Sequence, residues 1–239
     1  RILGEPYLES SYRLPENMIN ILKPEWDIPA DIRWSGAEHT LVRLLMHNIV
    51  YIPLLENIKK DKRKDIKIYE FGAGTTHNLF FLKKFMDFYL PDKNISYIAF
   101  DWSKSTGKIA KHLGKPFEYN YIDYYQKDTY PSIEEASYIF SLASFEQINT
   151  SVIGLLSFIA SSNPRLVINI EPIYQSLNKE NPMDNQSIEY MKSRNYLPDF
   201  ISSLLSIKMI KYPSLNLSVM RSGLGSQFLE GYTSVTWNC

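Results

Sequence analysis

One stretch of the sequence, residues 66–77, constrains the fold more than any other. It opens with an apolar run that alternates with polar residues, reaches the acidic Glu70, and then breaks into the closely spaced glycines Gly72 and Gly74. Residues 78–86 follow with apolar side chains at helical spacing. The pattern predicts a strand, a tight glycine turn and a helix, an arrangement typical of α/β domains that bind a ligand at the turn.

The composition of the turn favours a nucleotide or a nucleoside as that ligand. Gly72 and Gly74 let the backbone come close to a ligand, and the start of the helix offers backbone N–H groups. A dinucleotide-binding fingerprint would have a third glycine where this chain has His77, and a P-loop would end in Gly-Lys-Ser/Thr. The turn therefore disfavours binding of a pyrophosphate. The choice between the remaining nucleotide and nucleoside ligands depends on the rest of the chain.

The alternation of strand and helix continues beyond the turn. Residues 107–113 and 152–160 have helical spacing, and apolar runs lie between and around them. Five strands that alternate with helices predict an α/β fold with a doubly wound parallel sheet. The four strands expected after the first cover residues 96–102, 117–122, 137–144 and 165–172.

The C-terminal part predicts a different ending for the sheet. Helices are expected around residues 185–194 and 197–205, followed by two strands at 207–212 and 232–237. A loop rather than a convincing helix joins these two strands, so we expect an antiparallel hairpin. A dinucleotide-binding domain would continue with parallel crossovers instead.

Two acidic residues follow the second and third strands. Because the carboxyl ends of parallel strands meet at one edge of a sheet, Asp101 should lie beside the glycine turn. A carboxylate in that place can accept hydrogen bonds from two ribose hydroxyls. The alternatives are a helix cap for Asp101 and a turn aspartate for Asp123.

The order Glu70-x-Gly72-x-Gly74, then Asp101, then Asp123 resembles the class I S-adenosylmethionine-dependent methyltransferases over about residues 60–239. The resemblance implies a seven-stranded, Rossmann-like methyltransferase sheet with a terminal antiparallel hairpin, and S-adenosyl-L-methionine as cofactor. It also implies that Asp123 reaches the adenine amino group. The cofactor-binding residues that it implies are Glu70, Gly72, Ala73, Gly74, Thr75, Asp101, Trp102, Ile122, Asp123, Ser141 and Leu142.

Residues 141–147 and 168–172 look like the fourth and fifth strand ends of bacterial sugar O-methyltransferases found in surface-polysaccharide gene sets. This resemblance implies a small-molecule acceptor, a sugar or a capsule or lipopolysaccharide precursor, and a role in polysaccharide biosynthesis. Glu146 and Glu171 are the candidate catalytic bases, with His39 next. The alternatives are that Glu146 caps the following helix and that Glu171 is structural.

Several classes of function are disfavoured. The chain has 26 Lys and Arg residues against 26 Asp and Glu residues, so no basic field favours nucleic acid. Cys239 is the single cysteine, and residues 144–147 lack the adjacent Asp-Asn pair of metal-dependent catechol-type methyltransferases, so no metal is expected. No window approaches 18 consecutive apolar residues, so we expect a cytoplasmic protein without membrane insertion. The alternatives are a NAD-dependent Rossmann oxidoreductase and a non-catalytic cofactor-binding module.

Two regions are expected along the chain. Residues 1–58 would form an N-terminal arm and helix that cover the active site, and residues 59–239 the methyltransferase domain. A capping-box pattern predicts that the helix runs from residue 35 to about residue 50, and the charged run at 59–65 predicts a loop. The sequence begins at Arg1 rather than Met, so we expect a fragment of a longer chain. Nothing in it predicts the oligomeric state.

Overall fold

The structure is a computed structural model. The residues that it describes are 46–112, 114, 117–221 and 232–239.

The described residues form two compact units. Residues 46–61 and 81–91 belong to the first unit, and the described residues of 62–80 and 92–239 to the second. The expected arm, the start of the expected helix and His39 lie outside the described residues. The boundary after residue 58 stays a prediction.

The first unit is helical. It contains a π-helical turn η2 (Met46–Tyr51), the helix α4 (Ile52–Lys60) and most of α5 (His77–Tyr89), with Tyr51 and Phe85 in ring contact at 5.6 Å. The prediction that the helix ends near residue 50 is wrong, because the buried Leu54, Leu55 and Ile58 extend its apolar stripe. Proline is tolerated in the first turn of a helix, and Pro53 occupies that place in α4.

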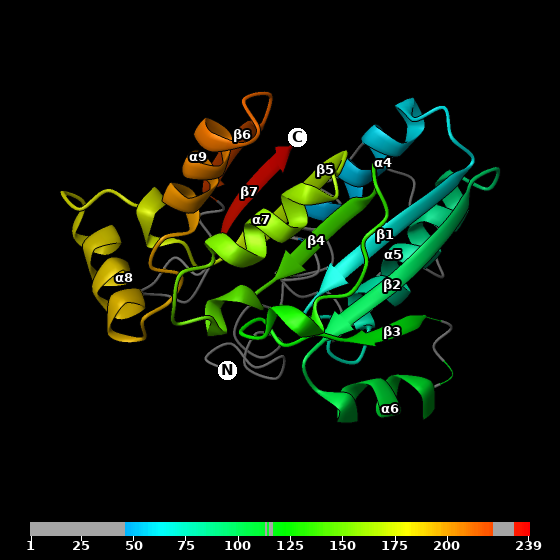
Figure 1. The fold of residues 1–239 in the computed structure, drawn as a ribbon, viewed down its shortest axis with the longest axis horizontal. Coiled ribbons are helices and arrows are strands. Elements are labelled where there is room, and N and C mark those ends of the chain that lie inside the picture. Colours follow the sequence, from blue (N-terminus) through cyan, green and yellow to red (C-terminus); the bar gives the residue numbers. More distant parts are fainter. Residues whose placement is uncertain (1–45, 113, 115–116, 222–231) are drawn as a thin grey trace, which may run out of the picture. The chain divides into compact units, whose positions relative to one another are not determined.

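The second unit contains a seven-stranded sheet in the order β3-β2-β1-β4-β5-β7-β6 (Figure 1). The first five strands are parallel, and β7 pairs antiparallel with both β5 and β6. This confirms the predicted methyltransferase-type sheet. The strands are β1 (Asp65–Phe71), β2 (Asn94–Asp101), β3 (Glu118–Tyr121), β4 (Tyr138–Leu142), β5 (Leu166–Glu171), β6 (Asn216–Arg221) and β7 (Thr233–Asn238).

Helices follow most of the strands. Apolar side chains of α7 and α9 share one buried cluster with β1, β2, β4, β5 and β7, and Figure 1 shows α7 lying across the sheet. The helical segments of this unit are α6 (Lys104–His112), α7 (Ile153–Ser161), α8 (Pro182–Ser193) and α9 (Phe200–Ile210), with the short 3-10 turns η3 (Lys127–Thr129), η4 (Phe145–Gln147) and η5 (Tyr174–Ser176).

The prediction of a strand at residues 207–212 is wrong. The helix α9 continues to Ile210, and the first strand of the hairpin is β6. The side chains of Phe200, Leu204 and Ile207 are buried at helical spacing, so this stripe packs as a helix. The alternation of apolar residues with lysines near the end of α9 resembled a strand only locally.

Candidate functional site

The glycine turn at the end of β1 leaves one open face. Gly72 and Gly74 have φ angles of 73° and 52°, in the left-handed region that favours glycine. A Cβ at Gly72 would lie 1.8 Å from Ser144 Oγ, whereas a Cβ at Gly74 would have no heavy atom of the described residues within 4 Å. Gly72 therefore makes room for the segment after β4, and Gly74 faces space that a ligand can occupy.

Asp101, at the end of β2, holds this turn. Its side chain is buried, and its Oδ2 accepts a hydrogen bond of 2.8 Å from the backbone N–H of Gly74. Its Oδ1 accepts one of 2.8 Å from the N–H of Ser103, two residues along the chain and just before α6, which is the contact of an Asx turn rather than of a helix cap. A carboxylate oxygen has two lone pairs, so both oxygens can accept a further hydrogen bond.

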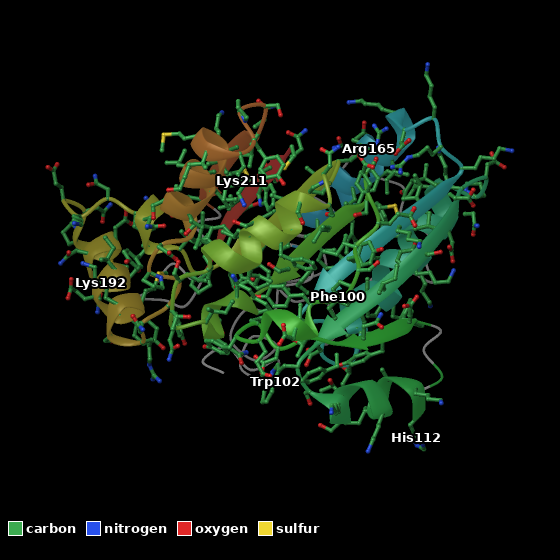
Figure 2. All side chains as sticks on the ribbon, in the orientation of Figure 1. Phe100, Trp102, His112, Arg165, Lys192 and Lys211 are labelled. Carbon is green, nitrogen blue, oxygen red and sulfur yellow. The ribbon has the colours of Figure 1, made fainter. Side chains whose placement is uncertain are left out.

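The other predicted cofactor-binding residues in this region are sequence neighbours of Gly74 and Asp101. Glu70 is buried and accepts a hydrogen bond of 2.7 Å from Asn78 Nδ2 at the start of α5. Ala73 is buried, and Thr75 is half-buried. Trp102 is 63% exposed, and Figure 2 shows it beyond the end of β2. A large exposed aromatic side chain next to Asp101 is available to a ligand.

Two predicted residues follow β3. Ile122 is fully buried in the core cluster, so its side chain packs inside the domain. The carboxylate of Asp123 accepts hydrogen bonds from the N–H of Tyr125 (2.9 Å) and from Gln126 Nε2 (2.7 Å). These contacts are those of a turn aspartate, which leaves Asp123 a smaller share of its hydrogen-bonding capacity for a ligand.

Glu171, at the end of β5, is fully buried and holds the segment after β4. It accepts hydrogen bonds from the Ser141 hydroxyl (2.7 Å), the Ser144 N–H (3.1 Å) and the Glu146 N–H (3.2 Å). Leu142, at the end of β4, is half-buried. Glu171 thus fixes the backbone that carries Glu146, and the structure brings both candidate bases to neighbouring strand ends.

A buried chain of hydrogen bonds continues from Glu171 into the sheet. Asn169 Nδ2 donates to the Ser141 hydroxyl (2.9 Å), and Trp237 Nε1 donates to Asn169 Oδ1 (2.9 Å). These hydrogen bonds connect β4, β5 and β7, so that β7, the last strand along the sequence, is linked to the site through β5 and β4. A buried polar network whose members are paired specifies one arrangement of its side chains.

The electrostatics favour the protonated forms of both glutamates. Burial and, to a smaller extent, the charge of Glu146 together raise the pKa of Glu171 to about 8, against the opposing effect of its hydrogen bonds. Burial raises the pKa of Glu146 to about 7. A half-buried carboxyl with a pKa near neutrality suits a general base, and Glu146 is the more accessible of the two.

Sequence reasoning missed Tyr124 and Ser144 as members of the site. Their hydroxyls form a hydrogen bond of 2.8 Å, and the ring of Tyr124 packs against Phe71 and Phe145. Burial raises the pKa of Tyr124 well above its usual value, so its hydroxyl stays protonated. A tyrosine directly after Asp123 at a strand end is the local signal that points to it.

Within the part of the chain that the structure describes, no group of three or more His, Cys, Asp or Glu side chains is placed to hold a metal ion. In the same residues, no helix combines the length and the apolar character needed to cross a bilayer. His39 lies outside the described residues.

Comparison of the fold with solved structures finds methyltransferases. The plantazolicin methyltransferase BamL, crystallised with a triazolic desmethylPZN analog and SAH, aligns with a TM-score of 0.56 and 13% identity over 82% of this chain and 85% of its own. The plantazolicin methyltransferase BpumL in complex with SAH aligns with a TM-score of 0.52 and 13% identity over 80% and 82%. The DszA carbon methyltransferase aligns with a TM-score of 0.53 and 10% identity over 85% and 55%.

No protein-family profile and no curated protein sequence matches the chain. The structural likenesses, at 10–13% identity, show the fold: a class I methyltransferase sheet.

Proposed function

We propose that the protein is an S-adenosylmethionine-dependent methyltransferase that acts on a small molecule. The observation that carries the proposal is the open face of Gly74, held beside the buried carboxylate of Asp101 at the carboxyl edge of the sheet. Ligands of open α/β sheets bind at this edge. Two of the methyltransferases described above, BamL and BpumL, contain SAH, which supports the same class of cofactor here.

The residues at this edge fit the groups of that cofactor. The free face of Gly74 would receive it, Asp101 would accept hydrogen bonds from its ribose, and the exposed ring of Trp102 would lie against its adenine. Asp123 would reach the adenine amino group with its remaining capacity. When bound, S-adenosylmethionine supplies an electrophilic methyl group.

For the acceptor, we propose a hydroxyl of a sugar or of a surface-polysaccharide precursor, methylated in the cytoplasm. Glu146 would accept the hydroxyl proton as the oxygen forms its bond to the methyl carbon and the carbon–sulfur bond breaks. Glu171 would hold the turn that carries Glu146, because its carboxylate is fully buried and bound to the Glu146 N–H. A sugar hydroxyl is barely acidic, so it gains from such a base.

A thermal-shift experiment tests the cofactor class against the alternatives. We expect S-adenosylhomocysteine to raise the melting temperature and NAD to leave it unchanged, because a ligand stabilises only the protein that binds it. Stabilisation by NAD alone would favour the oxidoreductase. Binding of S-adenosylhomocysteine without methyl transfer to any sugar in an acceptor screen would favour the non-catalytic module.

A further inference from the structure

Acidic side chains gather around the open glycine turn from several strand ends. Asp101 ends β2 and Glu171 ends β5, both buried, and Glu146 lies half-buried in η4. Glu171 accepts hydrogen bonds from the N–H groups of Ser144 and Glu146. Ser144 Oγ in turn lies 1.8 Å from where a Cβ of Gly72 would be, two residues before the Gly74 N–H that donates to Asp101. The three carboxyl groups therefore lie close enough to create one negative region at the site.

The hydrogen bonds that hold these acids come from neutral donors. Asp101 is bound by backbone N–H groups, and Glu171 by a serine hydroxyl and backbone N–H groups. A neutral donor orients a carboxylate but does not cancel its charge. Buried charges of the same sign that lie near one another disfavour one another, and a cation would relieve the repulsion.

The cation that fits is an organic one. Among the described residues, no group of three or more acidic, histidine or cysteine side chains is placed to hold a metal ion. The open face of Gly74 defines where a ligand lies, and the acids add the charge that the ligand meets there.

We infer that this site selects its cofactor by charge, so that it binds the sulfonium cation of S-adenosylmethionine more tightly than the neutral thioether S-adenosylhomocysteine. The inference rests on the proposed function. The two compounds differ by one methyl group and one positive charge, so the acids act on one of them and hardly on the other. Loss of the charge on methyl transfer would then weaken the hold on the product and favour its release.

The charge of the site depends on pH through Glu146 and Glu171. Below their pKa values, about 7 and about 8, both are neutral and the selection is weak, and it strengthens as they ionise. Among the described residues, the titratable groups that respond to this pair are Tyr124, through the charge of Glu171, and Tyr196, through the charge of Glu146. The pKa of Tyr196 is raised to about 12 and that of Tyr124 well above its usual value, so neither tyrosine ionises over this range.

Calorimetric titration of the full chain with each compound tests the inference. At about pH 8.5 we expect S-adenosylmethionine to bind at least about tenfold more tightly than S-adenosylhomocysteine, and the ratio to fall at least about threefold at about pH 6. Glu146→Gln and Glu171→Gln should each lower the ratio at the higher pH, with the affinity for S-adenosylhomocysteine within about twofold of wild type. Because Glu171 is buried and its variant is the less certain to fold, Glu146→Gln is the deciding one.

Glu134→Gln is the matched control. Glu134 is a half-exposed acid paired with Lys67 at 2.6 Å, before β4 and away from the carboxyl ends of the strands, so its variant should keep the wild-type ratio. Equal or tighter binding of S-adenosylhomocysteine at both pH values overturns the inference and leaves the proposed function standing. The same holds if the Glu146→Gln protein keeps the full ratio. If the wild-type protein binds neither compound, the proposed function fails, and the inference with it.

Discussion

At the scale of single residues, the two glycines of the turn are required for different reasons. Both have positive φ angles, but only Gly72 lies against another side chain, that of Ser144. Gly72 is therefore needed for the packing of β1 against the segment after β4, and we expect Gly74 to be needed for the close approach of the ligand. Substitution of Gly72 should mainly lower the stability of the protein, whereas substitution of Gly74 should also weaken ligand binding.

We expect Gly74→Ala to cost about 1–2 kcal/mol of stability, the typical cost of a left-handed residue that carries a Cβ, and to weaken binding of S-adenosylhomocysteine. Gly72→Ala should destabilise the protein by clearly more, because its Cβ would lie 1.8 Å from Ser144 Oγ. Urea unfolding of both variants measures the difference. Equal losses of stability would show that the contact with Ser144 relaxes without cost.

Asp101→Ala should weaken the binding of S-adenosylhomocysteine by about 1.5–3 kcal/mol, the range for a lost charge-assisted hydrogen bond. Part of the loss comes from the turn itself, because Asp101 also holds the Gly74 N–H. Asp128→Ala removes an exposed acid from η3 and serves as the control. An unchanged dissociation constant for Asp101→Ala, measured by calorimetry, would remove Asp101 from the site.

Glu146→Gln should lower kcat at saturating S-adenosylmethionine at least about tenfold, within the range for loss of a general base. In the wild-type protein, kcat should rise with pH through about 7 as Glu146 ionises, and the variant should lose this rise. The measurement is methyl transfer to the sugar acceptor found in a screen, with chemistry shown to be rate-limiting. A variant with the wild-type rate and pH profile would place the base elsewhere or show that the acceptor needs none.

At the scale of elements, the hairpin at the end of the chain supports the site from behind. Trp237 on β7 donates to Asn169 on β5, which donates to Ser141 on β4, which donates to Glu171. The row crosses the sheet with one side chain each from β7 and β4 and two from β5, Asn169 and Glu171. The antiparallel strand β7 is therefore connected to the turn after β4 by hydrogen bonds as well as by backbone pairing.

Trp237→Phe should reduce the free energy of unfolding by about 1–3 kcal/mol, because it keeps an aromatic ring but leaves the buried Asn169 Oδ1 without this donor. Chemical denaturation measures the loss. A double-mutant cycle with Asn169→Ala should show a coupling of at least about 0.5 kcal/mol between the two positions. Additive effects would mean that the hydrogen bond contributes little and that the change in ring volume dominates.

At the scale of the whole molecule, the burial of acids at the site makes stability depend on pH. A carboxyl whose pKa is raised by folding binds its proton more tightly in the folded state, so the folded state is favoured at low pH and loses this advantage as pH rises through the folded pKa. For Glu171 that window extends from its ordinary range up to about pH 8.

We therefore expect wild-type protein to lose stability relative to Glu171→Gln between about pH 5 and about pH 8, by up to about 1.4 kcal/mol per pH unit. The difference between the two proteins isolates Glu171 from other acids. Parallel stability curves for the two proteins, measured by urea unfolding across this range, would show that Glu171 titrates alike in the folded and unfolded chains.

Local patterns in the sequence determined the alternation of strands and helices, the glycine turn, and the order of the acids along the chain. The periodicity of apolar residues reports which faces are buried, and parallel strands end at one edge of a sheet. The proximity of Asp101 to Gly74 follows from these two facts alone. The class of fold followed from the same local signals, together with the late hairpin.

Only the tertiary structure decided how α9 ends and what each acid at the strand ends does. Residues 207–210 satisfy a strand pattern and a helix pattern at once, and packing against the core selects the helix. Glu171 and Glu146 look alike in the sequence. In the structure, Glu171 is fully buried and accepts hydrogen bonds from donors 25 to 30 residues away, whereas Glu146 is half-buried. Burial and hydrogen bonding between distant segments form only when the chain folds, so no local pattern contains them.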